Sequence, residues 1–170
     1  FDSDGIITGL DETFLKNLDD LLSRAKSADL RLYLCLTEWK GIKKFPSPVR
    51  DERQQKAYLE KAVAPLAKRF KDNGTVFAID VYNEIEAELR DDAPQKVTIK
   101  QGQDFIRSSV QTIKKEDPKR LVSAGSGFHG WKIVQDGHYK GLGLDFYDIH
   151  VYSDDGFLPD VQELKADRPV

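Results

Sequence analysis

Cysteine is almost absent from this sequence, since Cys35 is the only one among 170 residues. A single cysteine cannot form an internal disulfide bond or a cysteine cluster for a metal ion. It lies in the apolar triplet Leu34-Cys35-Leu36, so we expect a small buried thiol that packs as a hydrophobic side chain. The sequence therefore excludes a disulfide scaffold and says nothing about the redox compartment.

Long apolar runs and an excess of basic charge are also missing. No stretch approaches the ~18 apolar residues of a membrane-spanning helix. The 26 Lys and Arg residues are balanced by 29 Asp and Glu residues, which gives a formal net charge of -3. A nucleic-acid-binding domain usually carries a basic face. We therefore expect neither a membrane nor a nucleic acid as a partner.

The length and the hydrophobic content of 39% suffice for one globular domain over residues 1–170. No signal-peptide pattern is visible, and the chain starts at Phe1 rather than at a methionine. The compartment is therefore not assigned from these residues.

What the sequence does contain is an alternation of helical and strand-like segments. Helical spacing begins after Asp11, which is placed to cap the start of that helix. It begins again from about Asp51, with Pro65 inside as a kink or break, and again around Phe105–Ile113. Shorter helical patterns cover 131–136 and 157–165. Apolar runs of strand length cover 30–36, 77–82, 121–125 and 146–152.

These patterns predict which side chains are buried. The first helix should bury one apolar face that includes Phe14, Leu18 and Leu21. The run that starts at Phe77 is typical of a strand covered on both faces, interrupted only by Asp80.

Strands that alternate with helices imply right-handed βαβ units and a parallel sheet. This leaves an open doubly wound sheet or part of a (βα)8 barrel. No glycine-rich fingerprint follows any strand, so we expect no dinucleotide and no other cofactor. Polar and aromatic residues instead gather where the predicted strands end, namely Glu38, Trp39, Asn83, Glu84, Ser126, His129, His150 and Tyr152.

Barrel enzymes carry their chemistry at this C-terminal rim, on loops from several strands. We therefore predict an α/β fold of the (βα)8 TIM-barrel type. A complete barrel takes roughly 250 residues, and only about four βα units are visible, so residues 1–170 are expected to form the central part of a barrel.

Glu84 is the leading candidate for catalysis. A glycosidase acid must stay protonated near neutral pH, which requires partial burial and a nearby carboxylate. Asn83 could donate its amide to a sugar hydroxyl, such as the 2-OH. The alternative is that Asn83 and Glu84 only begin a loop. The acidic residues that follow are expected to form a solvated loop, and these are Glu86, Glu88, Asp91 and Asp92.

His150 and Tyr152 share one face of a strand with Asp148, because side chains alternate along a strand. On the barrel mouth they could bind a sugar or orient a carboxylate. The alternative is a satisfied core histidine and a half-buried tyrosine. A metal site made of Asp148, His150 and His129 is conceivable but lacks any established ligand spacing.

Trp39, Trp131 and Phe128 lie just beyond predicted strand ends, where aromatic rings stack on pyranose faces in sugar-binding clefts. Each could equally pack in the core. The tripeptide Gly125-Ser126-Gly127 lacks the longer pattern of a serine nucleophile elbow.

The run Phe77–Glu84 resembles strand four of the clan A glycoside hydrolases, especially family 5, the cellulases and mannanases. The run Asp148–Tyr152 is similar to their strand six with its His-x-Tyr pair. Asp117–Val122 followed by Gly125 resembles the start of strand five, and Ala166–Val170 the start of strand seven. The resemblance covers nearly the whole chain in the right order.

The resemblance implies a retaining glycosidase in which Glu84 is the acid/base. A second glutamate near the end of strand seven, expected beyond Val170, would be the nucleophile about 5 Å away. The segment alone is therefore expected to be inactive. β-Linked glucan or mannan is the implied substrate, and a secreted or periplasmic location would fit the family.

Two positions depart from the family pattern. Ile85 stands where most members have proline after Asn-Glu, and Thr37-Glu38-Trp39 stands where family 5 usually has a strand-three histidine. A hypothesis of another class is a non-catalytic carbohydrate-binding or scaffold half-barrel. Such an open half-barrel would expose strand edges and apolar surface, so it is expected to self-associate or to be completed by other segments.

Overall fold

A computed structural model describes residues 1–38, 47–91, 93, 96–127, 131–152, 162 and 164–170. The elements are, in chain order, α1 (Glu12–Ser27), β1 (Leu32–Cys35), α2 (Glu52–Tyr58), the π-helical turn η1 (Leu59–Val63), α3 (Ala64–Phe70), β2 (Val76–Asn83), the 3-10 turn η2 (Ile85–Glu88), α4 (Ile99–Glu116), β3 (Leu121–Ser126), α5 (Trp131–Gln135) and β4 (Asp148–Ile149).

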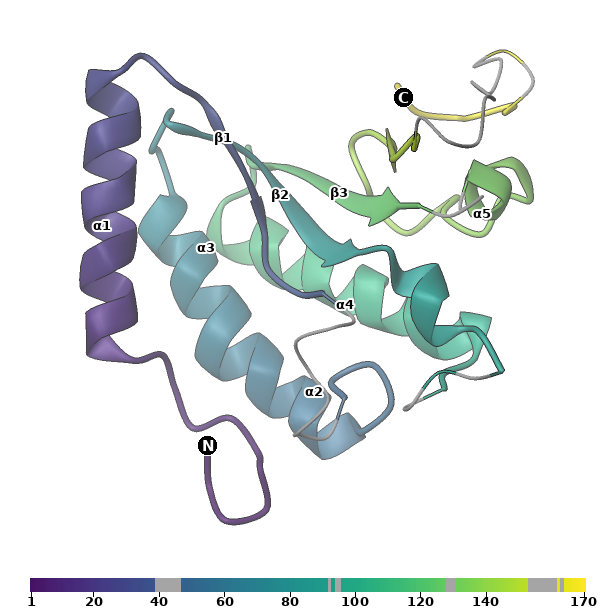
Figure 1. The fold of residues 1–170 in the computed structure, drawn as a ribbon, viewed down its shortest axis with the longest axis horizontal. Coiled ribbons are helices and arrows are strands. Elements are labelled where there is room, and N and C mark those ends of the chain that lie inside the picture. The colour runs from purple at the N-terminus through teal and green to yellow at the C-terminus, as the bar shows by residue number, and fades with distance from the viewer. Residues whose placement is uncertain (39–46, 92, 94–95, 128–130, 153–161, 163) are drawn as a thin grey trace.

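The described strands form one parallel sheet in the order β1-β2-β3-β4, which is the order of the sequence. Figure 1 shows α3 and α4 side by side against the same face of this sheet. A doubly wound sheet would reverse its strand order and carry helices on both faces. Strands in sequential order with their helices on one face form a segment of a (βα)8 barrel, as the sequence predicted.

Local side-chain hydrogen bonds explain where the helices begin. Asp11 accepts from the Phe14 amide at 3.0 Å, so the predicted cap of α1 is confirmed. Thr98 and Gln101 form a reciprocal capping box at the start of α4. Pro65 lies at the beginning of α3, and the turn before it widens into η1. A proline has no amide hydrogen and crowds the preceding turn, so the predicted interruption falls where it was expected.

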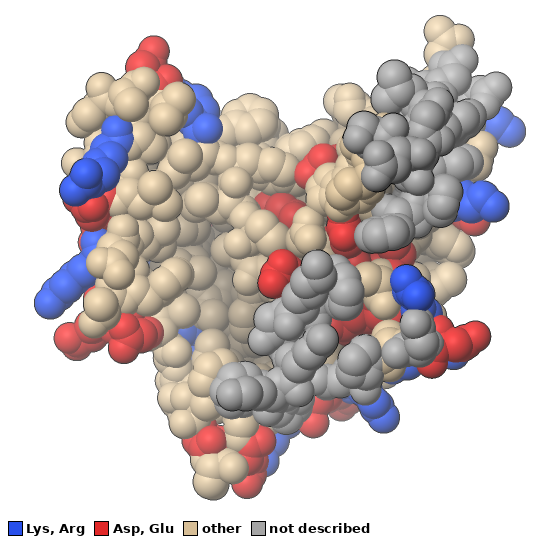
Figure 2. Space-filling model, in the orientation of Figure 1, with Lys and Arg blue, Asp and Glu red and all other residues tan. Residues whose placement is uncertain are grey.

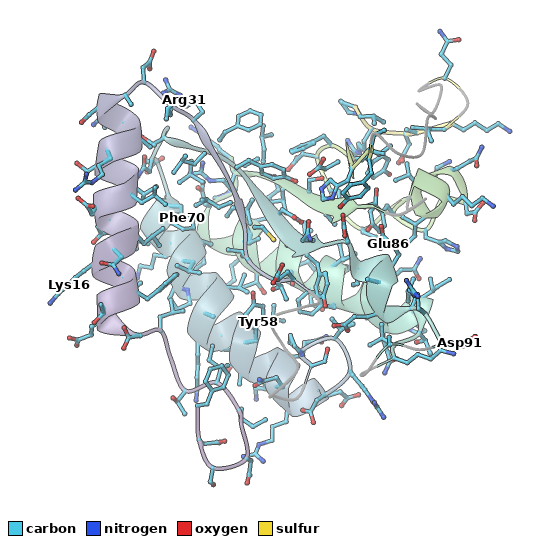
Figure 3. The ribbon with its side chains drawn as sticks, in the orientation of Figure 1. Lys16, Arg31, Tyr58, Phe70, Glu86 and Asp91 are labelled. Atoms are coloured by element: carbon cyan, nitrogen blue, oxygen red, sulfur yellow. The ribbon has the colours of Figure 1, made fainter. Side chains whose placement is uncertain are left out.

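The core lies between the sheet and the helices. The side chains of α4 contribute Phe105, Ile106 and Ile113, all at most 1% exposed. The Tyr82 ring on β2 meets Phe105 edge-on, with ring centroids 5.8 Å apart. Phe70 of α3 is buried against the same layer (Figure 3).

The other face of the sheet is concave and lacks a helical cover in the described part of the chain. Phe77 is therefore 52% exposed, and its expected burial was wrong. The other apolar residues of the same run are buried on both faces as expected, namely Ala78, Ile79, Val81 and Tyr82. The centroid of the Phe77 ring lies 6.4 Å from the ring centroid of Phe146. The Phe146 ring also packs on that of Tyr33, with their centroids 5.8 Å apart. Cys35 is exposed on its strand rather than buried, which corrects a second expectation.

Further differences concern α1 and the C-terminal segment. Phe14 and Leu21 are 45% and 46% exposed, because only the narrower stripe that contains Leu18 packs on the core. The regular pairing of β4 is limited to two residues, shorter than the predicted run over 146–152. The predicted helix over 157–165 falls largely outside the described residues. No helix in the described ranges is long and apolar enough to cross a membrane.

A buried ion pair lies where the strands of the sheet begin. It links Asp117, which follows α4, to Arg120, which precedes β3. Arg120 donates from Nε to Asp117 at 3.0 Å, and both side chains are at most 8% exposed. The same guanidinium donates to the carbonyl oxygens of Phe70 and Val76. It therefore fixes the connection from α3 into β2.

Candidate active site

The strands β2, β3 and β4 end together, and their last residues form the candidate site. Asn83 of β2 is paired with Gly125 of β3, and the next residue, Glu84, donates its amide to the Gly125 carbonyl at 3.0 Å. Glu84 adopts a left-handed backbone conformation with φ 55°. This conformation is uncommon for a residue with a side chain and is enriched at active sites, although Asp29, Asp72 and Lys165 also adopt it in this chain.

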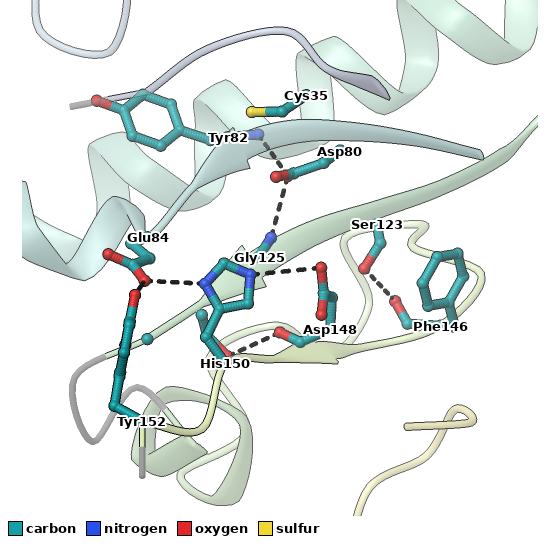
Figure 4. A network of polar contacts seen from close by, with 12 residues as sticks. Cys35, Asp80, Tyr82, Glu84, Ser123, Gly125, Phe146, Asp148, His150 and Tyr152 are labelled. Carbon is teal, nitrogen blue, oxygen red and sulfur yellow. Dashed lines mark hydrogen bonds and ion pairs between the residues drawn. The ribbon is translucent and has the colours of Figure 1, made fainter. Parts of the chain in front are cut away.

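The side chain of Glu84 is enclosed, with the residue only 5% exposed. Its Oε1 atom lies 2.8 Å from Nδ1 of His150. The Tyr152 hydroxyl donates to the same oxygen. Figure 4 shows both rings converging on this carboxyl group from the segment that follows β4. The two side chains that sequence alternation placed on one face therefore meet Glu84 together.

His150 lies between two carboxyl groups. Its Nδ1 atom faces Glu84, and its Nε2 atom lies 3.5 Å from Oδ2 of Asp148. Burial lowers the pKa of His150, but the hydrogen bond to Glu84 and the charge of Asp148 outweigh it, so the pKa lies above its ordinary value. The imidazolium form, which donates from both nitrogens, is thereby favoured.

Tyr152 is a stable hydrogen-bond donor in this arrangement. The hydrogen bond to Glu84, together with partial burial and the charge of the same carboxyl group, raises the pKa of Tyr152 to about 12. The phenol is therefore neutral across the range in which an enzyme works, and it keeps its proton for Glu84.

Two residues that were not predicted to belong to the site, Gly127 and Glu86, lie on the side of Glu84 that faces β3. A Cβ atom at Gly127 would overlap the Oε1 and Cδ atoms of Glu84, so only glycine fits there. The Gly127 amide donates to Oε1 of Glu86. Burial raises the pKa of Glu86 to about 7, against the opposing effect of hydrogen bonds from backbone amides.

The prediction that this acidic segment is a solvated loop was wrong for two of its members. Glu86 is partly buried against Gly127, and Glu88 is 6% exposed with its Oε1 accepting from the Tyr82 hydroxyl at 2.6 Å. Asp91 is exposed, as expected. Asp92 lies outside the described residues.

Asp80 is a further buried carboxyl group on the concave face. Its Oδ1 atom accepts from the amides of Gly125 at 3.0 Å and Tyr82 at 2.9 Å, where the register between β2 and β3 shifts. Burial raises the pKa of Asp80 to about 6, although these amides oppose the shift. The sequence signal for this buried carboxyl group was a lone Asp inside an apolar strand.

The thiol of Cys35 lies close to Asp80 (Figure 4). It donates to the Thr37 carbonyl oxygen at 3.1 Å. Cys35 is exposed as a residue, but its thiol is partly buried, and this desolvation together with the charge of Asp80 raises the pKa of Cys35 to about 12. The thiol is therefore not activated as a nucleophile.

The structure describes the remaining predicted site residues only in part. Asn83 lies beside Glu84, and its main-chain amide donates to the Thr37 carbonyl oxygen at 2.8 Å. Trp39, Phe128 and His129 lie outside the described residues. Trp131 is the first residue of α5, but its side chain is also outside what the structure describes.

The space-filling view shows acidic atoms in the middle of this face, with lysine and arginine mostly at its margins (Figure 2). Among the described residues, no group of three His, Cys, Asp or Glu side chains is arranged to hold a metal ion. The combination is a buried glutamate, two side chains that donate to it, and strands that end at one rim.

The comparison with protein families decides the classification. The model of the family described as cellulase (glycosyl hydrolase family 5) matches residues 3–166. The chain belongs to glycoside hydrolase family 5.

Two curated relatives are similar to this family 5 chain. It is 23% identical to a mannan endo-1,4-beta-mannosidase of Mytilus edulis, over 89% of this chain and 52% of that protein. It is 28% identical to the mannan endo-1,4-beta-mannosidase of Cryptopygus antarcticus, over 99% of this chain and 54% of that protein. The chain thus spans about half the length of these curated relatives.

Solved structures agree on the fold. The beta-1,4-mannanase of Aplysia kurodai superimposes with a TM-score of 0.79 at 20% identity, over 99% of this chain and 62% of that chain. The endo-1,4-beta-mannanase of Eisenia fetida gives a TM-score of 0.76 at 21% identity, over 99% and 59%. The family 5 chain therefore has the architecture of a partial (βα)8 barrel.

Proposed function

We propose that the protein containing this chain is a retaining β-glycosidase that hydrolyses β-1,4-linked mannan, with Glu84 as its acid/base. The observation that carries the proposal is the enclosed Glu84 carboxyl group with His150 and Tyr152 on one of its oxygens. It lies at the strand-end rim where barrel enzymes hold their catalytic residues.

In this proposal Glu84 acts twice. It first donates a proton to the glycosidic oxygen as the bond to the sugar breaks, and it then takes a proton from the water that attacks the glycosyl-enzyme. The neutral Tyr152 phenol and the His150 imidazolium stabilise the carboxylate between these steps. Their two hydrogen bonds also fix the orientation of the carboxyl group, so little reorganisation is needed during the reaction.

A retaining mechanism requires a second carboxylate about 5 Å from the first. The family resemblance assigns this role to a glutamate of strand seven, whose beginning corresponds to the segment before Val170. Asn83, one residue before the acid/base, would bind the sugar hydroxyl next to the reacting carbon. Trp39 and Trp131 would supply stacking surfaces for neighbouring sugar rings.

Mannan is proposed as the substrate because both curated relatives are mannan endo-1,4-beta-mannosidases. The similar structures include several mannanases, which supports the same polymer. The family also includes cellulases, so β-glucan is the substrate to compare.

The test uses the full-length protein with β-1,4-mannan and β-1,4-glucan, with the new reducing ends followed by proton NMR. A retaining enzyme releases the β-anomer first, and mutarotation then produces the α-anomer. Release of the α-anomer first would contradict the mechanism.

The variant Glu84→Gln should lower turnover of mannan by roughly 10²–10⁴-fold. Glu88→Gln is the matched control, because this buried carboxyl group on the same turn contacts Tyr82 rather than the site. Binding of mannan without turnover, unchanged in Glu84→Gln but lost in Trp39→Ala, would support the carbohydrate-binding half-barrel instead.

A further inference from the structure

Two acidic residues of the turn η2 point in different directions. Glu88 accepts from the Tyr82 hydroxyl at 2.6 Å and from Ser47 at 3.4 Å, away from the candidate site. Glu86 instead lies on the side of β3 (Figure 3), where its Oε1 atom accepts the amide hydrogen of Gly127. Its Oε2 atom is buried and has no hydrogen-bond partner among the described residues.

Gly127 is held between two glutamates. Its amide is bound by Glu86, and its α-carbon packs so closely on Glu84 that a Cβ atom would overlap the carboxyl group. Glu86 therefore fixes the piece of backbone that forms one wall around the proposed acid/base. No other described side chain bonds to this amide.

The charge of Glu86 also reaches the site. Burial and the charge of Glu84 raise the pKa of Glu86, whereas the Gly127 amide and His150 lower it. Electrostatic coupling is reciprocal, so an ionised Glu86 disfavours the ionised form of Glu84 and favours the imidazolium of His150. In the part of the chain that the structure describes, the other titratable groups that face Glu86 are the phenols of Tyr139 and Tyr152. Both stay neutral near pH 7, because the pKa of each is raised above its ordinary value.

Resting on the proposed function, we propose that Glu86 is a positioning residue for the acid/base. Its carboxyl group holds Gly127 against Glu84, and in its ionised form its negative charge favours the protonated state of Glu84, from which the leaving group takes the proton. A general acid requires this protonated state at the working pH.

The first experiment compares Glu86→Gln with Glu88→Gln in the full-length protein on β-1,4-mannan. A glutamine at position 86 keeps an oxygen for the Gly127 amide and removes only the charge. We expect the basic limb of the pH–kcat/KM profile to move about one unit to lower pH. Glu88→Gln should leave the limb in place. A wild-type profile for Glu86→Gln would overturn the electrostatic role.

A second variant separates position from charge. Glu86→Asp keeps the charge but is one methylene too short to reach Gly127. It should keep the basic limb near its wild-type pH and lower kcat by about tenfold with little change in KM. Wild-type kcat in Glu86→Asp would overturn the positioning role.

An NMR titration of the His150 ring gives a readout that needs no turnover. Removing the charge in Glu86→Gln should lower the titration midpoint of His150, and Glu88→Gln should not change it. If the protein hydrolyses no β-glycan but this midpoint falls, the proposed function fails and the coupling of Glu86 to the site stands. If mannan is hydrolysed and neither the midpoint nor the pH profile changes, the inference about Glu86 fails and the function stands.

Discussion

The Nδ1 atom of His150 lies 2.8 Å from Oε1 of Glu84, although the two residues are 66 positions apart in the sequence. The parallel strands β2, β3 and β4 bring them together, because each strand ends at the same rim. The Tyr152 hydroxyl joins them at the same oxygen. The predictions below follow from this contact and from the residues that hold it in place.

Tyr152→Phe should lower kcat on mannan by roughly 10–100-fold, because a hydrogen bond to a charged group contributes about 1.5–3 kcal/mol. KM should change little, since the hydroxyl contacts Glu84 rather than the substrate. Steady-state kinetics of the full-length protein measure both constants. Tyr147→Phe is the control, because that hydroxyl donates to Asp167. Equal kcat in Tyr152→Phe and wild type would refute the assignment.

Gly127→Ala should displace the carboxyl group of Glu84 and lower kcat by at least about tenfold. Overpacking at this position should also lower the free energy of unfolding by about 1–3 kcal/mol. Gly74→Ala is the matched control, because a Cβ there meets no atom within 4 Å. Urea unfolding and kinetics of both variants check the prediction, and similar losses in the two would count against it.

Asp80 should make stability depend on pH. Its pKa is about 6 in the folded chain, compared with about 3.9 when unfolded, because burial disfavours the charged form. The folded state therefore binds this proton more tightly. Its contribution to stability is complete below about pH 4 and is lost as the pH rises through about 6.

The loss assigned to Asp80 amounts to about 3 kcal/mol. Asp80→Asn should abolish that part of the decrease between pH 4 and pH 8, measured by urea unfolding at each pH. Asp72→Asn is the control, since Asp72 is exposed and its backbone, with φ 59°, suits asparagine. A pH dependence unchanged in Asp80→Asn would show that another group is responsible.

Arg120→Lys should destabilise the fold by roughly 2–4 kcal/mol, because lysine cannot replace the forked contacts with Asp117 and two carbonyl oxygens. The exposed pair of Arg24 and Asp20 on α1 is the comparison, and Arg24→Lys should change stability by less than about 0.5 kcal/mol. Denaturant midpoints of the two variants test this contrast. Equal midpoints would contradict the structural role of the buried pair.

Much of the site could be predicted because it depends on local rules. Alternation along one strand placed His150 and Tyr152 on the same face, and the end of an apolar run placed Glu84 at the rim of the sheet. The cap of α1 at Asp11 and the interruption at Pro65 likewise follow from short-range chemistry.

Other features could not be predicted because they depend on distant packing. Glu86 lies in an acidic stretch that is typical of a solvated loop, but in the structure it is partly buried and accepts from the Gly127 amide, 41 positions later. The apolar residues around Phe77 in the sequence predict that it is buried, but its exposure depends on which face of the sheet the helices cover. Neither arrangement leaves a periodic signal in the sequence.

The central claim, that Glu84 is the acid/base of a retaining glycosidase, is tested most directly by azide rescue of Glu84→Ala. The full-length variant is given an aryl β-mannoside, whose leaving group needs no proton, so the glycosyl-enzyme forms and then waits for water. Azide needs no base to attack it. The account predicts faster turnover with azide and a β-mannosyl azide as product, and turnover independent of azide would contradict it.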